Sequence, residues 1–432
     1  MIAKSKMTQV YQDVACTGCG CVCDDLQITV EQNRITHFEP PCPLAERWFK
    51  QANQTSTTTA WIDEEPCDMA TALDRAAEIL QRARLPLIYG LASSSTPGQR
   101  AAVALADRLG AVIDTAASSC HGPSIQAIQQ VGESNCTLGE IKNRADLVIY
   151  WGSDPVKNHP RHFERYSIDP LGMFVPEGRD GRTLVVIDTE RTASAEQADH
   201  FIQVAPNSDF EIFWVLRAIL RSVAVDVEQI GGVAKQVWQE LLERMKHCRC
   251  GVFFFGRGLT QHATAHATVE ALLLLTRELN DVTRFHARRM RVYGDVAGAD
   301  SVLCWRTGFP FSVNLATGVP RYNPGEYSAP HLLAAKEVDA CLLIGNEGIA
   351  TFSAAAAEQL RSIPTIALGS PGTHWPLAPS IRFATSTYGI HAQGTAYRMD
   401  EVPIPLRSYL STNLPRDADV LNALQQRIQA NK

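Results

Sequence analysis

Residues 86–114, PLIYGLASSSTPGQRAAVALADRLGAVID, decide the expected fold of this 432-residue chain. Residues 86–90 form an apolar run that ends at a glycine, which is typical of a buried strand. Residues 99–110 have the periodicity of a helix, and residues 111–114 form a second short apolar run. A strand, a helix and a second strand in this order predict a βαβ unit of a parallel sheet.

The same alternation of apolar runs and helical stretches continues along the chain. Helical patterns cover residues 68–83 and an Ala- and Leu-rich stretch that ends near Leu279. The carboxyl ends of parallel strands carry the loops that bind ligands in open α/β folds. Further strands are predicted at residues 147–152, 184–188, 252–256, 340–345 and 364–368.

The composition is that of a soluble globular protein, with 45% hydrophobic and 20% charged residues. The net charge of -6 is not gathered in blocks, which argues against binding of nucleic acid or an anionic membrane. The first residues read as neither a signal peptide, a membrane span nor a transit peptide. No later apolar run reaches the roughly 20 residues of a membrane helix. We expect a cytoplasmic protein.

Five of the twelve cysteines crowd into the first 42 residues, which favours metal ligation over disulfides in a reducing compartment. Four thiolates in this spacing suit a [4Fe–4S] cluster. A structural zinc site is the alternative, and an empty relict site is a third. Cys21 is a spare thiol that could replace a neighbour. The proposed cluster ligands are Cys16, Cys19, Cys23 and Cys42.

The chain length predicts two to three domains. Residues 1–58 are polar and cysteine-rich, and we expect a small iron–sulfur module whose folding energy comes from its metal. Residues 59–118 and 301–400 form one discontinuous α/β domain in this division. Residues 119–300 form a second α/β domain, and residues 401–432 form a helical tail.

The sequence CTGCGCVCDDL at residues 16–26 resembles the opening of the B subunit of formylmethanofuran dehydrogenase. This family is grouped with the molybdopterin formate dehydrogenases. Ordered matches over nearly the whole chain make a chance similarity implausible. The other matching segments are residues 119–124, 139–146, 150–152, 159–162, 320–326 and 394–399.

The resemblance implies a bis-pterin guanine dinucleotide cofactor that carries tungsten or molybdenum, held by the two α/β domains. The family's metal-ligand cysteine falls on Cys120, its active-site histidine on His121 and its active-site arginine on Arg291. A thiolate after the predicted strand at 111–114 could hold a soft metal, with an imidazole as proton carrier and a guanidinium for a carboxylate or CO2. The residues alone also fit a buried structural cysteine beside a surface histidine.

Further residues are assigned to cofactor binding. Asp188 ends a predicted strand, where a carboxylate accepts hydrogen bonds from a ribose or guanine or caps the next helix. Gly258 and Thr260 lie in a glycine turn that suits a close approach to phosphate. Asp154, His159 and Asn323 complete this set.

Three departures from the family pattern fall where the family uses its cofactor. Residues 260–263 read TQHA and differ from the usual Thr-His-Ser pattern. Residues 292–295 read VYGD in place of Gly-His-Tyr-Asn. Residues 345–352 read GNEGIATF where the family usually has Ser-Asp-Pro-Gly-Ala-His-Phe. These changes favour the hypothesis of a scaffold subunit that has lost its redox cofactor, while the complete cysteine set favours a redox enzyme.

We therefore expect a formate dehydrogenase-like α/β fold and the B subunit of a formylmethanofuran dehydrogenase complex. The alternatives are a non-redox subunit of a formyltransferase/hydrolase complex and a molybdopterin oxidoreductase with another substrate. The residues after Met399 are too few for the C-terminal β-barrel of formate dehydrogenases. The resemblance implies separate partner subunits: a β-barrel subunit that closes the pterin site, an amidohydrolase-like subunit and a formyltransferase-like subunit.

Overall fold

The computed structural model describes residues 8–430, and the chain divides into two compact units. Unit 1 comprises the chain up to Ser119 and from Tyr293 on, and unit 2 comprises Cys120–Val292. Residues 1–7 lie outside the described residues. They begin both the expected iron–sulfur module and the stretch that reads as neither a signal peptide, a membrane span nor a transit peptide. Residues 431–432 of the expected tail also lie outside the described residues.

Unit 1 is built on a sheet with the strand order β16-β15-β7-β6-β17-β18-β19-β4-β5. The five strands from β7 to β19 pair in parallel, and the strands at both edges pair antiparallel. The strands are β4 Ala60–Ile62, β5 Glu65–Cys67, β6 Pro86–Gly90, β7 Val112–Thr115, β15 Val313–Asn314, β16 Arg321–Tyr322, β17 Ala340–Ile344, β18 Thr365–Gly369 and β19 Ile381–Ala384.

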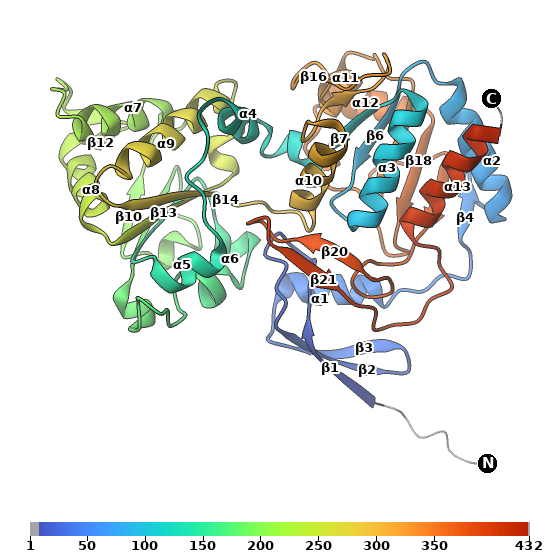
Figure 1. The fold of residues 1–432 in the computed structure, drawn as a ribbon, viewed down its shortest axis with the longest axis horizontal. Helices are drawn as coiled ribbons and strands as arrows, with labels where there is room; N and C mark the ends of the chain where they lie inside the picture. Colours follow the sequence, from blue (N-terminus) through green and yellow to red (C-terminus); the bar gives the residue numbers. More distant parts are fainter. Residues whose placement is uncertain (1–7, 431–432) are drawn as a thin grey trace. The chain divides into compact units, whose positions relative to one another are not determined.

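Helices cover both faces of this sheet, which explains the continuous apolar runs of its central strands. Ile88 of β6 belongs to one core, whereas its neighbours Leu87 and Tyr89 belong to the core on the other face. Figure 1 shows α2, α3 and α13 side by side on one face. That face carries α2 Met69–Arg82, α3 Thr96–Leu109, α10 Val296–Thr307 and α13 Asp417–Ala430, and the other face carries α11 Ala329–Ala334 and α12 Ala354–Ser362.

The N-terminal part of unit 1 is a three-stranded antiparallel sheet with one helix. Val22 packs there against Ile404 and Leu406 of a C-terminal hairpin, so an apolar cluster joins the two ends of the described chain. The segment expected as a helical tail therefore begins with a strand. These elements are β1 Thr8–Val14, β2 Leu26–Glu31, β3 Arg34–Glu39, α1 Pro43–Ala52, β20 Gly394–Tyr397 and β21 Pro403–Leu406.

Unit 2 has a five-stranded, wholly parallel sheet in the order β10-β9-β8-β13-β14. Its strands are β8 Leu147–Trp151, β9 Thr183–Asp188, β10 His200–Gln203, β13 Cys250–Phe255 and β14 Arg284–Arg289. Its helices are α4 Gly122–Val131, α5 Leu138–Arg144, α6 Pro155–Asn158, α7 Asp209–Leu220, α8 Lys235–His247 and α9 Ala265–Leu279. A two-stranded hairpin, β11 Gln229–Ile230 and β12 Val233–Ala234, completes the unit.

The prediction of an α/β fold with parallel sheets is confirmed, since a strand occupies each of the seven apolar runs singled out above. β6, β8 and β17 are buried along their whole length, which is why continuous apolar runs predicted them correctly. The four-part domain division stays a prediction beside the two compact units of the structure.

Candidate functional site

A hydrogen bond from a side chain to a backbone carbonyl group joins Thr260 to Cys120 in unit 2. The Thr260 hydroxyl donates a hydrogen bond of 2.6 Å to the carbonyl oxygen of Cys120. Cys120 is 2% exposed and Thr260 is 5% exposed, so this bond is shielded from water. Thr260 follows β13, and the contact therefore fixes Cys120 against the carboxyl edge of the parallel sheet.

His121 occupies the N-cap position of α4 and is completely buried. Its Nε2 lies 3.2 Å from the carbonyl oxygen of Met290, and its Nδ1 lies 3.2 Å from the Ser124 hydroxyl. A carbonyl oxygen can only accept, so Nε2 carries the proton and Nδ1 accepts from Ser124. Burial and the nearby Arg291 guanidinium lower the pKa of His121 to about 3.

His159 binds the backbone of Arg291, the residue that follows Met290. Its Nε2 donates a hydrogen bond of 2.8 Å to the carbonyl oxygen of Arg291. Burial lowers the pKa of His159 to about 4, so the ring is neutral at pH 7. The Nδ1 atom of this buried ring has no hydrogen-bond partner among the described residues. It is an acceptor that awaits a donor.

The structure thus brings together the three predicted catalytic residues on one edge of unit 2. His121 is the chain neighbour of Cys120 and binds the carbonyl group of the residue before Arg291. Met290 directly follows β14, and its amide donates to the Phe255 carbonyl at the end of β13. Arg291 is 3% exposed, so its guanidinium group also lies within the protein.

Asp154 lies on the loop after β8, and Asp188 is the last residue of the neighbouring strand β9. Oδ1 of Asp154 accepts hydrogen bonds from the backbone amide and the hydroxyl of Ser194. Asp188 ends β9, and its Oδ1 accepts from the backbone amide of Thr189 at 2.8 Å. Burial raises the pKa of Asp188. The Asp188 side chain is half-buried, which leaves part of it open to a ligand.

Gly258 has a packing reason to be glycine. A Cβ atom at this position would lie 2.6 Å from the Cα of Gly152, so only glycine lets the loops after β8 and β13 meet. Its contact with phosphate stays a prediction. Asn323 belongs to unit 1, and its Nδ2 donates to Oε2 of Glu326 at 2.5 Å.

The predicted cluster ligands lie together in unit 1. Cys16, Cys19 and Cys23 are on the loop between β1 and β2, and Cys42 is at the N-cap of α1. All four are nearly inaccessible to solvent. The Cys16 amide donates to the Cys23 carbonyl at 2.7 Å, which closes the loop. Burial raises the pKa of the Cys16 and Cys42 thiols.

One hydrogen bond within the cysteine loop reaches a sulfur atom. The Gly18 amide donates to the Cys16 sulfur at 3.4 Å, a contact that stabilises thiolate ligands. Within residues 8–430, no three His, Cys, Asp or Glu side chains form a group suited to one metal ion. Whether these cysteines hold a cluster or a zinc ion stays a prediction.

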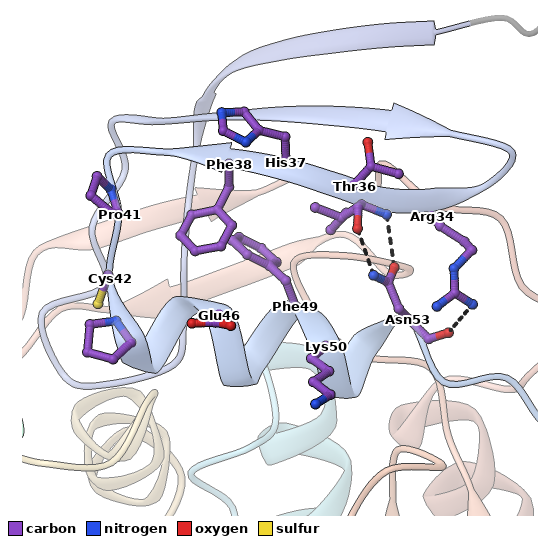
Figure 2. Close-up of a pocket in the computed structure, with 12 residues that line it drawn as sticks. Arg34, Thr36, His37, Phe38, Pro41, Cys42, Glu46, Phe49, Lys50 and Asn53 are labelled. Carbon is purple, nitrogen blue, oxygen red and sulfur yellow. Dashed lines mark hydrogen bonds between the residues drawn. The ribbon is translucent and has the colours of Figure 1, made fainter.

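A groove of about 610 Å³ runs between β3 and α1 beside Cys42. Figure 2 shows the Cys42 sulfur near one end and Arg34 and Asn53 near the other. The centroids of the Phe38 and Phe49 rings lie 5.2 Å apart, between these two ends of the groove. Asn53 binds both the amide and the carbonyl group of Ile35, so the side chain ties the helix to the strand.

Two contact residues of the site were missed from sequence. Ser124 lies within the matching segment at 119–124, but no pattern indicates that its hydroxyl faces His121. The Met290 carbonyl group also carries no sequence signal, because backbone acceptors are the same in every residue.

Among the described residues, no helix is both long and apolar enough to cross a membrane.

No family model matches the chain. Curated relatives do match over almost its full length. It is 37% identical over 433 aligned residues to the B subunit of tungsten-containing formylmethanofuran dehydrogenase 2 of Methanocaldococcus jannaschii, covering 98% of this chain and 99% of the relative. It is 33% identical to the protein of the same name from Methanococcus maripaludis, covering 98% and 100%.

Two further comparisons bear on the fold. The B subunit of the formyltransferase/hydrolase complex Fhc of Methylorubrum extorquens is 25% identical over 66% of this chain and 74% of the relative. A chain of the crystal structure of that FhcABCD complex with methylofuran has a TM-score of 0.69 at 21% identity, covering 86% of this chain and 99% of that one. Acetylene hydratase from Pelobacter acetylenicus has a TM-score of 0.66 at 10% identity, covering 97% and 69%.

The fold and the buried residues define an α/β protein with one wholly parallel sheet, one sheet whose central strands are parallel, and a cysteine-rich N-terminal part. Its relatives are subunits of complexes that act in one-carbon metabolism. The chain belongs to the family of formylmethanofuran dehydrogenase B subunits.

Proposed function

We propose that this chain is the redox subunit of a formylmethanofuran dehydrogenase complex, which interconverts CO2 and formate and couples this step to the formation or breakdown of formylmethanofuran. The observation that carries the proposal is the joint placement of Cys120, His121 and Arg291 at one edge of unit 2. The 37% identity to a tungsten-containing relative supports it.

Cys120 is the residue that would hold the tungsten or molybdenum of a bis-pterin guanine dinucleotide. A thiolate suits a soft metal, and the buried loop excludes water from it. That centre, when bound, supplies the two-electron chemistry. The Arg291 guanidinium would hold the carboxylate of formate or orient CO2 through paired N–H groups.

The unpartnered Nδ1 of His159 is a specific reason to expect a ligand in unit 2. A buried acceptor without a donor costs about 1–3 kcal/mol, and a pterin ring carries N–H donors at its edge. The half-buried Asp188 and the loop with Asp154 lie on the same edge of the sheet. Gly258, Thr260 and, from unit 1, Asn323 complete the proposed cofactor-binding residues.

Cys16, Cys19, Cys23 and Cys42 would hold one [4Fe–4S] cluster that passes electrons to or from the site. Their burial fits this role, because a cluster shielded from water keeps its oxidation states from side reactions. The Gly18 amide on the Cys16 sulfur is a hydrogen bond of the kind that tunes cluster potentials.

The proposal includes a cytoplasmic heteromeric complex. Its partners are an amidohydrolase-like subunit that joins formate to methanofuran, a β-barrel subunit that closes over the pterin, and a formyltransferase-like subunit. The relatives are named as subunits of such enzymes and complexes. No contact with nucleic acid or membrane is part of this function.

A second candidate function is a non-redox scaffold of a formyltransferase/hydrolase complex without pterin. The resemblance to the B subunit of Fhc in sequence and fold favours it. Within unit 1, Glu347 of the departing loop is half-buried, and its Oε1 accepts a hydrogen bond from the Ser93 hydroxyl. Its carboxylate, when ionised, would disfavour an anionic dinucleotide.

The test is dye-linked oxidation of formylmethanofuran by the complete complex, purified without oxygen. The redox function predicts turnover that is lost in Cys120→Ser and kept in Cys250→Ser. Cys250 is a matched control because it is also a buried cysteine of unit 2 but lies in the strand β13. Hydrolysis of formylmethanofuran without any dye reduction in the unmodified complex would support the scaffold instead.

A further inference from the structure

Two successive carbonyl groups of unit 2 are each bound by a buried histidine. His121 donates from Nε2 to the Met290 oxygen at 3.2 Å, and His159 donates from Nε2 to the Arg291 oxygen at 2.8 Å. The histidines come from separate loops, one at the start of α4 and one after α6. Two independent loops therefore bind the backbone of the dipeptide Met290–Arg291, which directly follows β14.

The geometry determines which ring nitrogen carries the proton in each case. A carbonyl oxygen has no proton to give, so both Nε2 atoms are donors whatever the charge of the ring. The Nδ1 of His121 is already engaged with the Ser124 hydroxyl. Both ring nitrogens of His121 are therefore engaged within the protein, in a site where the side chain is completely buried.

The backbone of the dipeptide is also fixed from the other side. The Met290 amide donates to the Phe255 oxygen at 2.9 Å, which continues the pairing of β13 with β14 by one residue. With both carbonyl groups held as well, the peptide planes of Met290 and Arg291 have little freedom to rotate. The direction in which the Arg291 side chain leaves the backbone is set by these planes.

We propose that His159 is a positioning residue which, together with His121, clamps the Met290–Arg291 backbone and so aims the Arg291 guanidinium. The clamp acts through the two Nε2–H donors and requires no proton transfer by either ring. Its effect on turnover rests on the proposed function, whereas the clamp itself does not.

The experiment compares three substitutions of His159 in the complete complex. Glutamine places an amide N–H near the position of Nε2 and cannot act as a proton carrier. Asparagine is too short to reach the Arg291 oxygen, and leucine has no donor. His162→Leu is the matched control, because His162 is a buried histidine of the same segment whose Nδ1 contacts Tyr150 and Ser167 instead.

The first measurement is hydrogen exchange by mass spectrometry of peptides that contain residues 288–292. We expect exchange at least about tenfold faster in His159→Leu and His159→Asn, which corresponds to about 1.4 kcal/mol. We expect His159→Gln and His162→Leu to stay near the unmodified rate. Equal exchange in all variants, or equal acceleration in the glutamine and leucine variants, would overturn the clamp.

The second measurement is the kcat and KM for formate in the same variants. We expect kcat to fall less in His159→Gln than in His159→Leu, and His159→Asn to raise KM because Arg291 is no longer aimed. An equal fall of kcat in the glutamine and leucine variants would overturn the donor role. A complex with no formate turnover in any form, but with the expected exchange pattern, would reject the proposed function and leave the clamp standing.

Discussion

The Thr260 hydroxyl lies 2.6 Å from the carbonyl oxygen of Cys120 and donates a hydrogen bond to it. This bond links the turn after β13 to the residue that we propose as the metal ligand. Because both residues are buried, water cannot replace the bond if the hydroxyl is removed. The position of the Cys120 backbone therefore depends on a side chain 140 residues farther along the chain.

Thr260→Val should lower the thermal stability of the complex and its content of tungsten or molybdenum. Valine keeps the shape of threonine but leaves the Cys120 carbonyl without its donor, at a cost of about 1–3 kcal/mol. Thr260→Ser is the control and should retain both properties. Elemental analysis and thermal unfolding measure the outcome, and a normal metal content in the valine variant would contradict the role of the bond.

Substitution of Cys42 by alanine should abolish the iron content of the complex, whereas Cys21→Ala should retain it. Both thiols are buried, but Cys42 occupies the N-cap position of α1, while Cys21 contacts the thiols of Cys19 and Cys23. Iron analysis with electron paramagnetic resonance of the reduced complex measures this. Iron loss in both variants would mean that Cys21 is itself a ligand.

Gly258→Ala should destabilise unit 2, because its Cβ would meet the backbone of Gly152 at 2.6 Å. A backbone clash cannot be relieved by a side-chain rotation, so we expect a cost of at least about 2 kcal/mol. Gly139→Ala in α5 is the control, since the nearest atom would lie 3.6 Å from the methyl group that alanine adds there. Chemical unfolding followed by fluorescence should separate the two variants, and equal midpoints would contradict the packing argument.

Stability should fall as the pH drops from 7 to 5, in part because of His159. Its pKa is about 4 in the folded chain and about 6.5 when unfolded, so the unfolded state binds more protons between these values. This contribution is complete above pH 6.5 and declines by up to about 1.4 kcal/mol per pH unit below it. His159→Gln should show a shallower decline in thermal midpoint, and identical pH profiles would refute the assignment.

Sequence patterns predicted the central strands well because β6, β8 and β17 are buried on both faces and read as apolar runs. They missed β14, whose sequence RFHARR looks like a solvated charged segment. Two of its arginines, Arg288 and Arg289, are nevertheless buried, and Arg289 lies 3.5 Å from Glu133 in an ion pair. Sequence reasoning that treats charged residues as exposed fails where those residues form ion pairs inside the protein.

Sequence reasoning also identified only part of the candidate site. Cys120, His121 and Arg291 could be named from the resemblance to the family. Thr260 and His159 were also named, as cofactor-binding residues, whereas Ser124 was not. The bonds that these three side chains make could not be predicted, because they depend on how distant loops meet. Tertiary contacts of this kind leave no periodic signal in one sequence.

The most direct test of the redox function is the Fe, W and Mo content of the complex purified without oxygen, measured per copy of this chain. The account predicts about four iron atoms for the cluster and about one tungsten or molybdenum atom. A complex that hydrolyses formylmethanofuran yet contains none of these metals would contradict it.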